Sequence, residues 1–520
     1  MTDSQSQPPA DSSRRESDPA PHPAPGIKRQ FAWSLAPLLV VTVLNLFSVR
    51  LFFRYLGDEI YALWGYVATF TGMFGFADLG LGVAVGRYMG VALGRGDREA
   101  VREYWGTGNV IALPLLGLMG AVFALLGVFC GPHWFNVSPA NAGLLRACFA
   151  VGGLALFVSY YSQFWLILSQ AHLDFKFIGI LRSVGSIVQI VPAILLARWT
   201  KDPLILVSWA AGVGFLQLIV FIWHARRKYR LGAELRHARR ARFQEMAAYT
   251  GKSFAALVVG SFFGSIDRFV LGRLAPSSGT DFTNYTNGAV NVGSRLQGLG
   301  VAVMGPVFYN TTRTAEDKQG AASARIYNET FNFIFGWYLL AAIWVAAWHP
   351  VLLRLWLGSE RGAQVAPLFT PIVVAYCLTA MANISTAQLG AINRLGTVLG
   401  FSVVNGLFTA AGVYLGWRLG GIVGVAYGFL CSRIVNLAQD VYTLLLIKAG
   451  GWFSPQTWKS IGAQLVVGGI FGCACLSVPR ESYWLLIPAT LHGGLVAAWL
   501  SRHYVRKFLT VAFVPQPTTS

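Results

Sequence analysis

The chain has 520 residues, of which 55% are hydrophobic and only 12% charged, and its mean hydropathy is +0.53. A soluble domain of this size needs more charged surface, so the composition excludes a soluble protein. The formal net charge of +19 would indicate a nucleic-acid partner only if membrane topology did not explain it.

Residues 1–26 are rich in Pro, Ser and charged side chains, which predicts a disordered tail. Apolar runs of about 20 residues follow, the length that a helix needs to cross roughly 30 Å of hydrocarbon. Helices are expected because backbone groups in lipid must be satisfied within the segment. The sequence therefore predicts an all-α polytopic membrane protein whose fourteen spans lie near 31–53, 60–80, 107–129, 144–168, 178–197, 204–223, 254–272, 284–308, 329–348, 365–389, 396–416, 420–442, 461–478 and 483–500.

The lysines and arginines are unevenly distributed over these spans. If both termini are cytoplasmic, 28 of the 41 basic residues lie in cytoplasmic segments and nine lie outside. This bias is typical of membrane topology, so no nucleic-acid partner is expected. The densest block is in the loop 226–252, which is expected to fix the topology and to contact anionic lipid headgroups.

The basic loop also predicts the domain organisation. An N-lobe of six spans (27–225) precedes it, and a C-lobe of six spans (253–445) follows. Two further spans and a cytoplasmic tail occupy 446–520. Paired six-helix bundles are the arrangement that alternating access uses, with each lobe rocking about a central site.

Motifs of enzymes and metal sites are missing from the sequence. The six cysteines are scattered, the eight histidines have no zinc-ligand spacing, and no loop is long enough to fold as a catalytic domain. We therefore expect no metal, no cofactor and no enzymatic activity.

The most informative stretch is NYTNGAVNVGSRLQGLG, residues 284–300. At 100° per residue, its polar side chains form one line along the eighth span, including Asn287, Asn291 and Arg295. Arg295 lies some 17 Å from the outer end of that helix. A buried arginine at such depth costs roughly 2.5–3.5 kcal/mol, so it should face a polar cavity or a carboxylate. A structural ion pair with Asp267 is the alternative.

Other charged residues in the spans indicate the character of the interior. Arg268 lies in the seventh span, while Arg50 and Arg54 lie near the outer end of the first, where reaching to water is an equal alternative. Asp267 and Asp78 are the acids well inside spans, and they are candidates for ion coupling or for pairing with an arginine. A net cationic interior suits an anionic cargo such as a pyrophosphate, because guanidinium groups bind phosphate through two parallel hydrogen bonds.

Several motifs resemble one family. YLGDEIYALW, ADLGLGVAVGRYMG, SIDRFVLGRL with NYTNGAVNVGSRL, LRLWLGSE and GGIVGVAYGFLCSRI resemble, in order and spacing, the Wzx-like polysaccharide flippases of the MATE/MOP exporter superfamily. The resemblance covers about residues 30–445. It implies a V-shaped fold of two six-helix lobes plus two C-terminal helices.

The resemblance also implies a function. Such proteins move undecaprenyl-diphosphate-linked oligosaccharide from the cytoplasmic to the periplasmic leaflet of the bacterial inner membrane, for surface polysaccharide or exopolysaccharide assembly. Membrane lipids, a polysaccharide polymerase and export proteins are the further partners that it suggests. The chain departs from drug-exporting relatives in having Asn45 and no acid in the middle of the first span, which leaves the coupling ion open. A drug or small-metabolite exporter and a non-transporting scaffold of a polysaccharide-assembly complex are the alternatives.

Overall fold

The structure is a computed structural model that describes residues 27–75, 81–298, 321–392 and 394–446, together with residues 462, 465, 466, 469 and 473. Within those residues it is helical throughout, with no strand. The prediction of an all-α polytopic membrane protein is confirmed.

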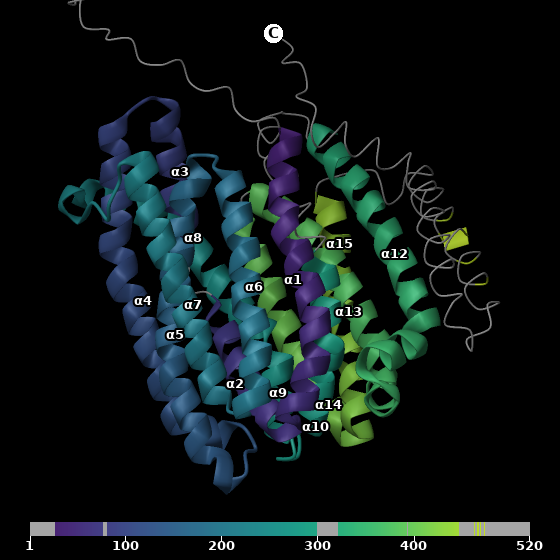
Figure 1. The fold of residues 1–520 in the computed structure, drawn as a ribbon. Helices are drawn as coiled ribbons and strands as arrows, with labels where there is room; N and C mark the ends of the chain where they lie inside the picture. Colours follow the sequence, from purple (N-terminus) through teal and green to yellow (C-terminus); the bar gives the residue numbers. More distant parts are fainter. Residues whose placement is uncertain are drawn as a thin grey trace, which may run out of the picture.

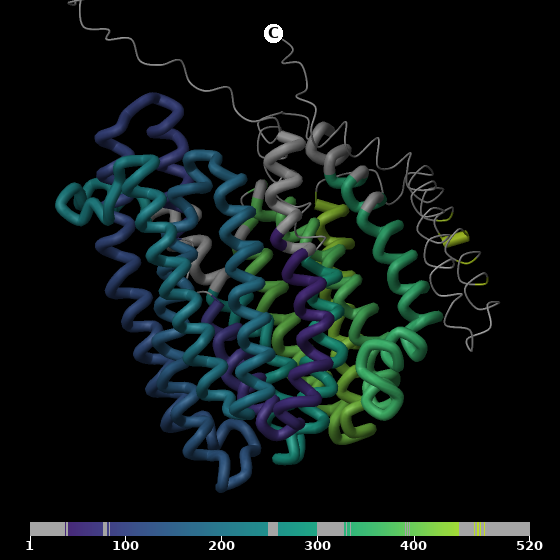
Figure 2. The backbone as a smooth tube through the Cα atoms, in the orientation of Figure 1, coloured from purple at the N-terminus to yellow at the C-terminus, as the bar shows by residue number. Residues whose placement is uncertain are grey.

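The helices of the first half of the chain lie on one side of the molecule, and α1 runs along the front beside them (Figures 1 and 2). Their bounds are α1 Ile27–Leu56, α2 Asp58–Met73, α3 Leu81–Gly94, α4 Arg98–Trp134, α5 Pro139–Ala171, α6 Phe175–Thr200 and α7 Pro203–His224.

The helices of the second half lie on the other side, except that α8 reaches back to contact α2, α3 and α4 of the first group (Figure 1). Their bounds are α8 Arg240–Gly264, α9 Ile266–Leu274, α10 Thr280–Thr283, the π-helix η5 Asn284–Val290, α12 Ala321–Leu357, α13 Ser359–Ala391, α14 Leu395–Ser432 and α15 Ile434–Leu446. After η5 the chain stays helical over 291–298.

Seven helical segments of the described chain are long and apolar enough to cross a membrane. The last of them, Gly396–Leu446, covers two predicted spans. Inside α14 the backbone leaves the helical region at Gly420 and Gly421, and Gly421 has φ of 58°, which a residue without Cβ adopts at no steric cost. This is the turn between the eleventh and twelfth predicted spans. The thirteenth and fourteenth lie almost entirely outside the described residues.

Two segments differ from the sequence-based expectation. α2 ends at Met73, before the predicted end of the second span, and a separate helix α3 covers residues expected to be a cytoplasmic connection. The segment 226–252 is largely helical: α7 ends in a π-helix, Ala225–Tyr229, and α8 begins already at Arg240. Arg, Gln, Glu, Met and Ala at the start of α8 all favour helix, which hydropathy alone does not register.

At the end of the first group that the sequence predicts to be cytoplasmic, an ionic cluster surrounds Asp174, which lies between α5 and α6. Its carboxylate Oδ2 accepts hydrogen bonds from Lys228 Nζ at 2.5 Å, His224 Nε2 at 2.9 Å and Tyr229 Oη at 2.9 Å. Burial raises the pKa of Asp174, but the bonds from Lys228, His224 and Tyr229 outweigh it, so this pKa is below its ordinary value. The π-helix is thereby tied to the α5–α6 turn.

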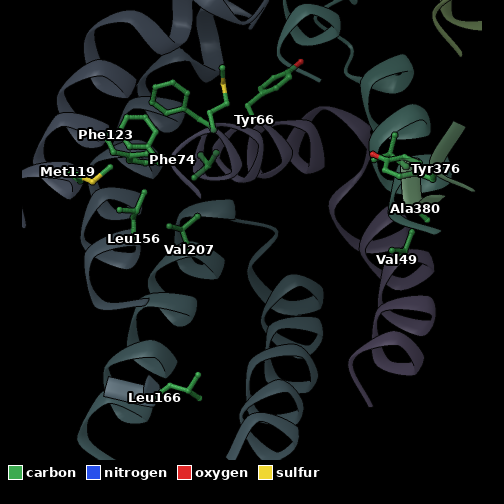
Figure 3. Close-up of a cluster of buried hydrophobic side chains, with 14 of the residues drawn as sticks. Val49, Tyr66, Phe74, Met119, Phe123, Leu156, Leu166, Val207, Tyr376 and Ala380 are labelled. Carbon is green, nitrogen blue, oxygen red and sulfur yellow. The ribbon is translucent and has the colours of Figure 1, made fainter. Parts of the chain in front are cut away.

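Aromatic side chains pack against one another in the core, part of which Figure 3 shows. Phe74, directly after α2, lies against Phe123 of α4 with ring centroids 5.4 Å apart, and Tyr66 stacks on Phe135 with ring centroids 4.5 Å apart. The ring centroid of Tyr66 also lies 4.5 Å from that of Phe282 of α10, so Tyr66 connects the two helix groups. The end that the sequence predicts to be periplasmic is called the outer end below.

Candidate functional site

The polar stripe of the eighth predicted span does not run straight, because its first part is a π-helix. A π-helix has more residues per turn than an α-helix, so successive side chains are rotated by less than the 100° per residue assumed from the sequence. Asn284 is consequently turned toward α13, where its Nδ2 donates to Gln364 Oε1 at 3.2 Å and its Oδ1 accepts from Arg361 Nη1 at 3.1 Å. Asn284 therefore bonds α13, and the rest of the stripe follows it along the chain.

The next residues of the stripe have unused hydrogen-bonding groups. Asn287 Nδ2 and Thr286 Oγ1 are buried and have no hydrogen-bond partner in the described structure. Asn291 is half-buried, and its carbonyl accepts from Ser294 Oγ at 3.0 Å. Because a buried polar atom costs free energy unless it is bonded, the unused groups of Thr286 and Asn287 favour a polar ligand or water beside this helix.

Arg295 is half-buried and forms no ion pair with any residue that the structure describes. Its Nε is buried without an acceptor. The alternative pairing with Asp267 is not present: Asp267 Oδ2 accepts from Tyr285 Oη at 3.0 Å, and Oδ1 lies 3.6 Å from Arg268 Nε. Within the described chain, the guanidinium of Arg295 remains available to a ligand.

Arg268 and Asp267 are neighbours in α9 and face different surroundings. Asp267 is 2% exposed and turns into the second helix group, where it lines a cavity. Arg268 Nη2 donates to Gly264 O at 3.0 Å and to Ser265 Oγ at 3.1 Å. Ser265 Oγ lies 2.6 Å from the position that a Cβ on Gly72 of α2 would take, so Arg268 is held next to the boundary with the first helix group.

The cavity has a volume of about 230 Å³ and lies among α8, α9, α13 and α14. Its polar lining consists of one acid, one guanidinium, and amide, phenol and hydroxyl groups: Asp267, Arg433, Gln297, Asn405, Tyr376, Thr379, Ser402 and Thr409. The sequence-predicted arginines do not line it. Its size is below the roughly 300–1,000 Å³ of pockets for drug-sized ligands, so it suits a small polar group.

Arg433, at the junction of α14 and α15, is a site residue that the sequence reasoning left out. Its side chain is 5% exposed, donates from Nη2 to Ser432 Oγ at 2.9 Å and also to Thr409 Oγ1, and lies 4.4 Å from the ring of Phe429. No carboxylate pairs with it within the described residues. The signal was visible as a lone arginine within GGIVGVAYGFLCSRI.

The remaining predicted residues lie elsewhere. Arg50 is exposed and donates from Nη1 to Leu355 O of α12 at 3.1 Å, which links α1 to the second helix group. Arg54 is exposed one turn later. Asp78 lies outside the described residues. The structure therefore brings Asp267 and Arg268 together, and it places Arg50 in a contact between α1 and α12.

The outer end is closed by a polar contact between the two helix groups. Arg361 Nη2 of α13 lies 2.7 Å from Asp58 Oδ1 of α2, and Thr280 Oγ1 of α10 donates to Asp58 Oδ2 at 2.9 Å. Asp58, Arg361 and Thr280 are called the outer contact below. Among the described residues, no cluster of His, Cys, Asp or Glu could hold a metal ion.

Comparisons with known proteins agree with this geometry. A family model described as polysaccharide biosynthesis protein matches residues 27–311, more than half of the chain. No curated protein sequence matches the chain.

Solved structures show the fold. The lipid II flippase MurJ in an inward closed conformation is 14% identical, with a TM-score of 0.65 over 92% of this chain and 99% of that one. An inward-facing multidrug resistance MATE family transporter of the MOP superfamily is 16% identical, with a TM-score of 0.62 over 80% of this chain and 98% of that one. A MOP superfamily transporter from Pyrococcus furiosus is 15% identical, with a TM-score of 0.59 over 82% and 97%.

The MurJ and MATE structures are a flippase and a transporter, and the likeness shows that this chain shares their fold, as predicted. The chain belongs to the polysaccharide biosynthesis protein family and has the multi-pass fold of MOP-superfamily transporters.

Proposed function

We propose that the protein flips undecaprenyl-diphosphate-linked oligosaccharide from the cytoplasmic to the periplasmic leaflet of a bacterial inner membrane, with both termini in the cytoplasm. The observation that carries the proposal is Arg295, a deeply placed guanidinium without an ion pair in the described chain. An arginine so placed is costly unless a ligand compensates it. The family, which serves polysaccharide biosynthesis, supports a glycan-bearing anion as that ligand.

The chemistry of the site suits a diphosphate. A guanidinium donates two parallel charge-assisted hydrogen bonds to phosphate oxygens, and Arg295 has an unused Nε donor. Arg268 lies at the boundary between the two lobes predicted from the sequence, so it would meet the same headgroup as the lobes move. Asn287 and Asn291 provide amides on the Arg295 helix for sugar hydroxyls. The lipid tail stays in the bilayer.

Alternating access supplies the transport step. With the outer contact closed, the cargo would enter from the cytoplasmic side, and breaking the pair of Asp58 and Arg361 would open the opposite side. A cationic-drug exporter would need free carboxylates. The acid that lines the cavity, Asp267, already accepts from Tyr285 and lies beside Arg268.

The test is complementation of a deletion strain. We expect the strain to accumulate the lipid-linked intermediate and to lose surface polysaccharide, and the wild-type gene to restore it. Arg295→Ala should fail to complement while still inserting in the membrane, and Arg295→Lys should complement poorly, because an ammonium cannot reproduce the forked geometry. Arg418→Ala is the matched control, since this exposed arginine bonds only Tyr414, one turn away, among the described residues. Normal polysaccharide with Arg295→Ala would refute the role of Arg295.

A further inference from the structure

Asp440 of α15 is a buried acid with no assigned role. It is 2% exposed, and its Oδ1 accepts a hydrogen bond from Ser385 Oγ of α13 at 2.5 Å. The Ser385 hydroxyl proton is used in that bond, so Tyr327 Oη of α12, 2.7 Å away, is the donor to Ser385 Oγ. Asp440 Oδ2 is buried without any hydrogen-bond partner in the described structure.

No cation in the described chain neutralises this carboxyl. Arg433 lies about two turns before Asp440, at the junction of α14 and α15, and is bonded to the hydroxyls of Thr409, Ser432 and Thr379 instead. From α12, the titratable group that faces Asp440 is Tyr327. From α13, only the Ser385 hydroxyl reaches Asp440, and α14 contributes no charged or titratable group there. Every neighbour of Asp440 in the described chain is thus neutral.

Two other buried or half-buried acids of the described chain each have a cation beside them. Asp267 has Arg268 at 3.6 Å together with a tyrosine donor, and Asp58 has Arg361 at 2.7 Å. An ionised carboxylate with one hydrogen bond and no counter-ion is very costly in a membrane interior, whereas the neutral acid costs far less. The surroundings of Asp440 therefore suit the protonated form.

We propose that Asp440 is a proton-binding site that is occupied in this conformation and must empty for the transport cycle to proceed. The proton sits on Oδ2. On release it passes to water, Oδ1 keeps its bond from Ser385, and no other bond changes. Asp440 is six residues before the end of α15, about 9 Å, at the end predicted to be cytoplasmic, so that solution receives the proton. Binding the proton favours the closed state, and losing it favours a state in which α15 meets water.

Infrared spectroscopy of the full chain in lipid nanodiscs tests the site directly. We expect a carbonyl band of a protonated carboxylic acid at neutral pH that disappears on alkalinisation. Asp440→Asn should remove it, and Glu360→Gln, a change at an exposed acid, should leave it. Ser385→Ala should shift its frequency, because the carbonyl loses its hydrogen bond. A spectrum without this band, or a band that persists in Asp440→Asn, overturns the proposal.

Coupling is tested in cells and rests on the function proposed above. Asp440→Asn is nearly isosteric with a protonated aspartic acid, so it should insert and fold normally but lose most polysaccharide delivery, and Asp440→Glu should restore part of it. Full delivery with Asp440→Asn overturns the coupling role. If the gene deletion itself leaves polysaccharide unchanged, the proposed function fails, but the infrared result still decides whether Asp440 binds the proton.

Discussion

Removing the charge of Asp58 should open the outer end of the protein. The pair of Asp58 and Arg361 has side-chain exposures of 18% and 23%, so it is mostly buried, and Arg361 also lies 4.6 Å from the ring of Phe53. A surface pair contributes roughly 0–1 kcal/mol, and losing one partner of a fully buried pair costs roughly 3–5 kcal/mol. For this intermediate case we expect about 2 kcal/mol, a roughly 30-fold shift in the conformational equilibrium.

The shift can be measured by spin-label distances between the two helix groups. Labels at exposed positions 140 and 363, on α5 and α13, report the outer separation in a cysteine-free background. If the outer-open state is about 1% of the wild type, it should reach about a quarter in Asp58→Asn. Arg418 is an outer arginine that bonds Tyr414 of its own helix, so Arg418→Ala should leave the distribution unchanged. An unaltered distribution in Asp58→Asn would show that the aromatic packing, and not the ion pair, closes this end.

Three further variants test other parts of the structure. Gly428→Ala should lower the free energy of unfolding by about 1–3 kcal/mol, because the added Cβ would collide with the backbone carbonyl of Gly412. Gly400→Ala places its Cβ in open space and should leave the free energy of unfolding unchanged. Thermal unfolding in detergent compares the two variants. The pKa of Asp174 in the cluster with Lys228 is lowered, so the stabilisation by this cluster is complete above the ordinary aspartate pKa and is lost as pH falls through the lowered value. Hydrogen exchange of the π-helix Ala225–Tyr229 should accelerate in that acidic window. The absence of any acceleration would contradict the assignment. Arg433→Gln should reduce polysaccharide delivery with little loss of membrane insertion, and normal delivery would remove the cavity from the transport path.

The spans were predictable because their signal is local. Backbone groups in lipid must be satisfied within the segment, so an apolar run of sufficient length is enough to place a helix. The turn at Gly420 and Gly421 falls where two predicted spans meet for the same reason. The π-helix from Asn284 was not predictable, since its extra residue is stabilised by contacts with α13, which lies some 80 residues away in sequence.

The site was predictable only in part. The depth of Arg295 follows from counting residues along one helix, but its freedom from Asp267 depends on Tyr285 and Arg268 occupying that carboxylate. Arg433 and Asp440 were overlooked because each looks unremarkable alone. What distinguishes them is the set of groups around them, and those groups come from other helices.

The sequence by itself determined that this protein is an all-helical membrane protein with an interior richer in arginine than in acid, because transfer from water to hydrocarbon depends on each segment's own composition. The tertiary structure decided which charges are paired: Asp58 meets Arg361 across the two helix groups, while Arg433 and Asp440 meet only neutral side chains. Pairing requires atoms within a few ångströms, and helix packing alone brings distant residues that close.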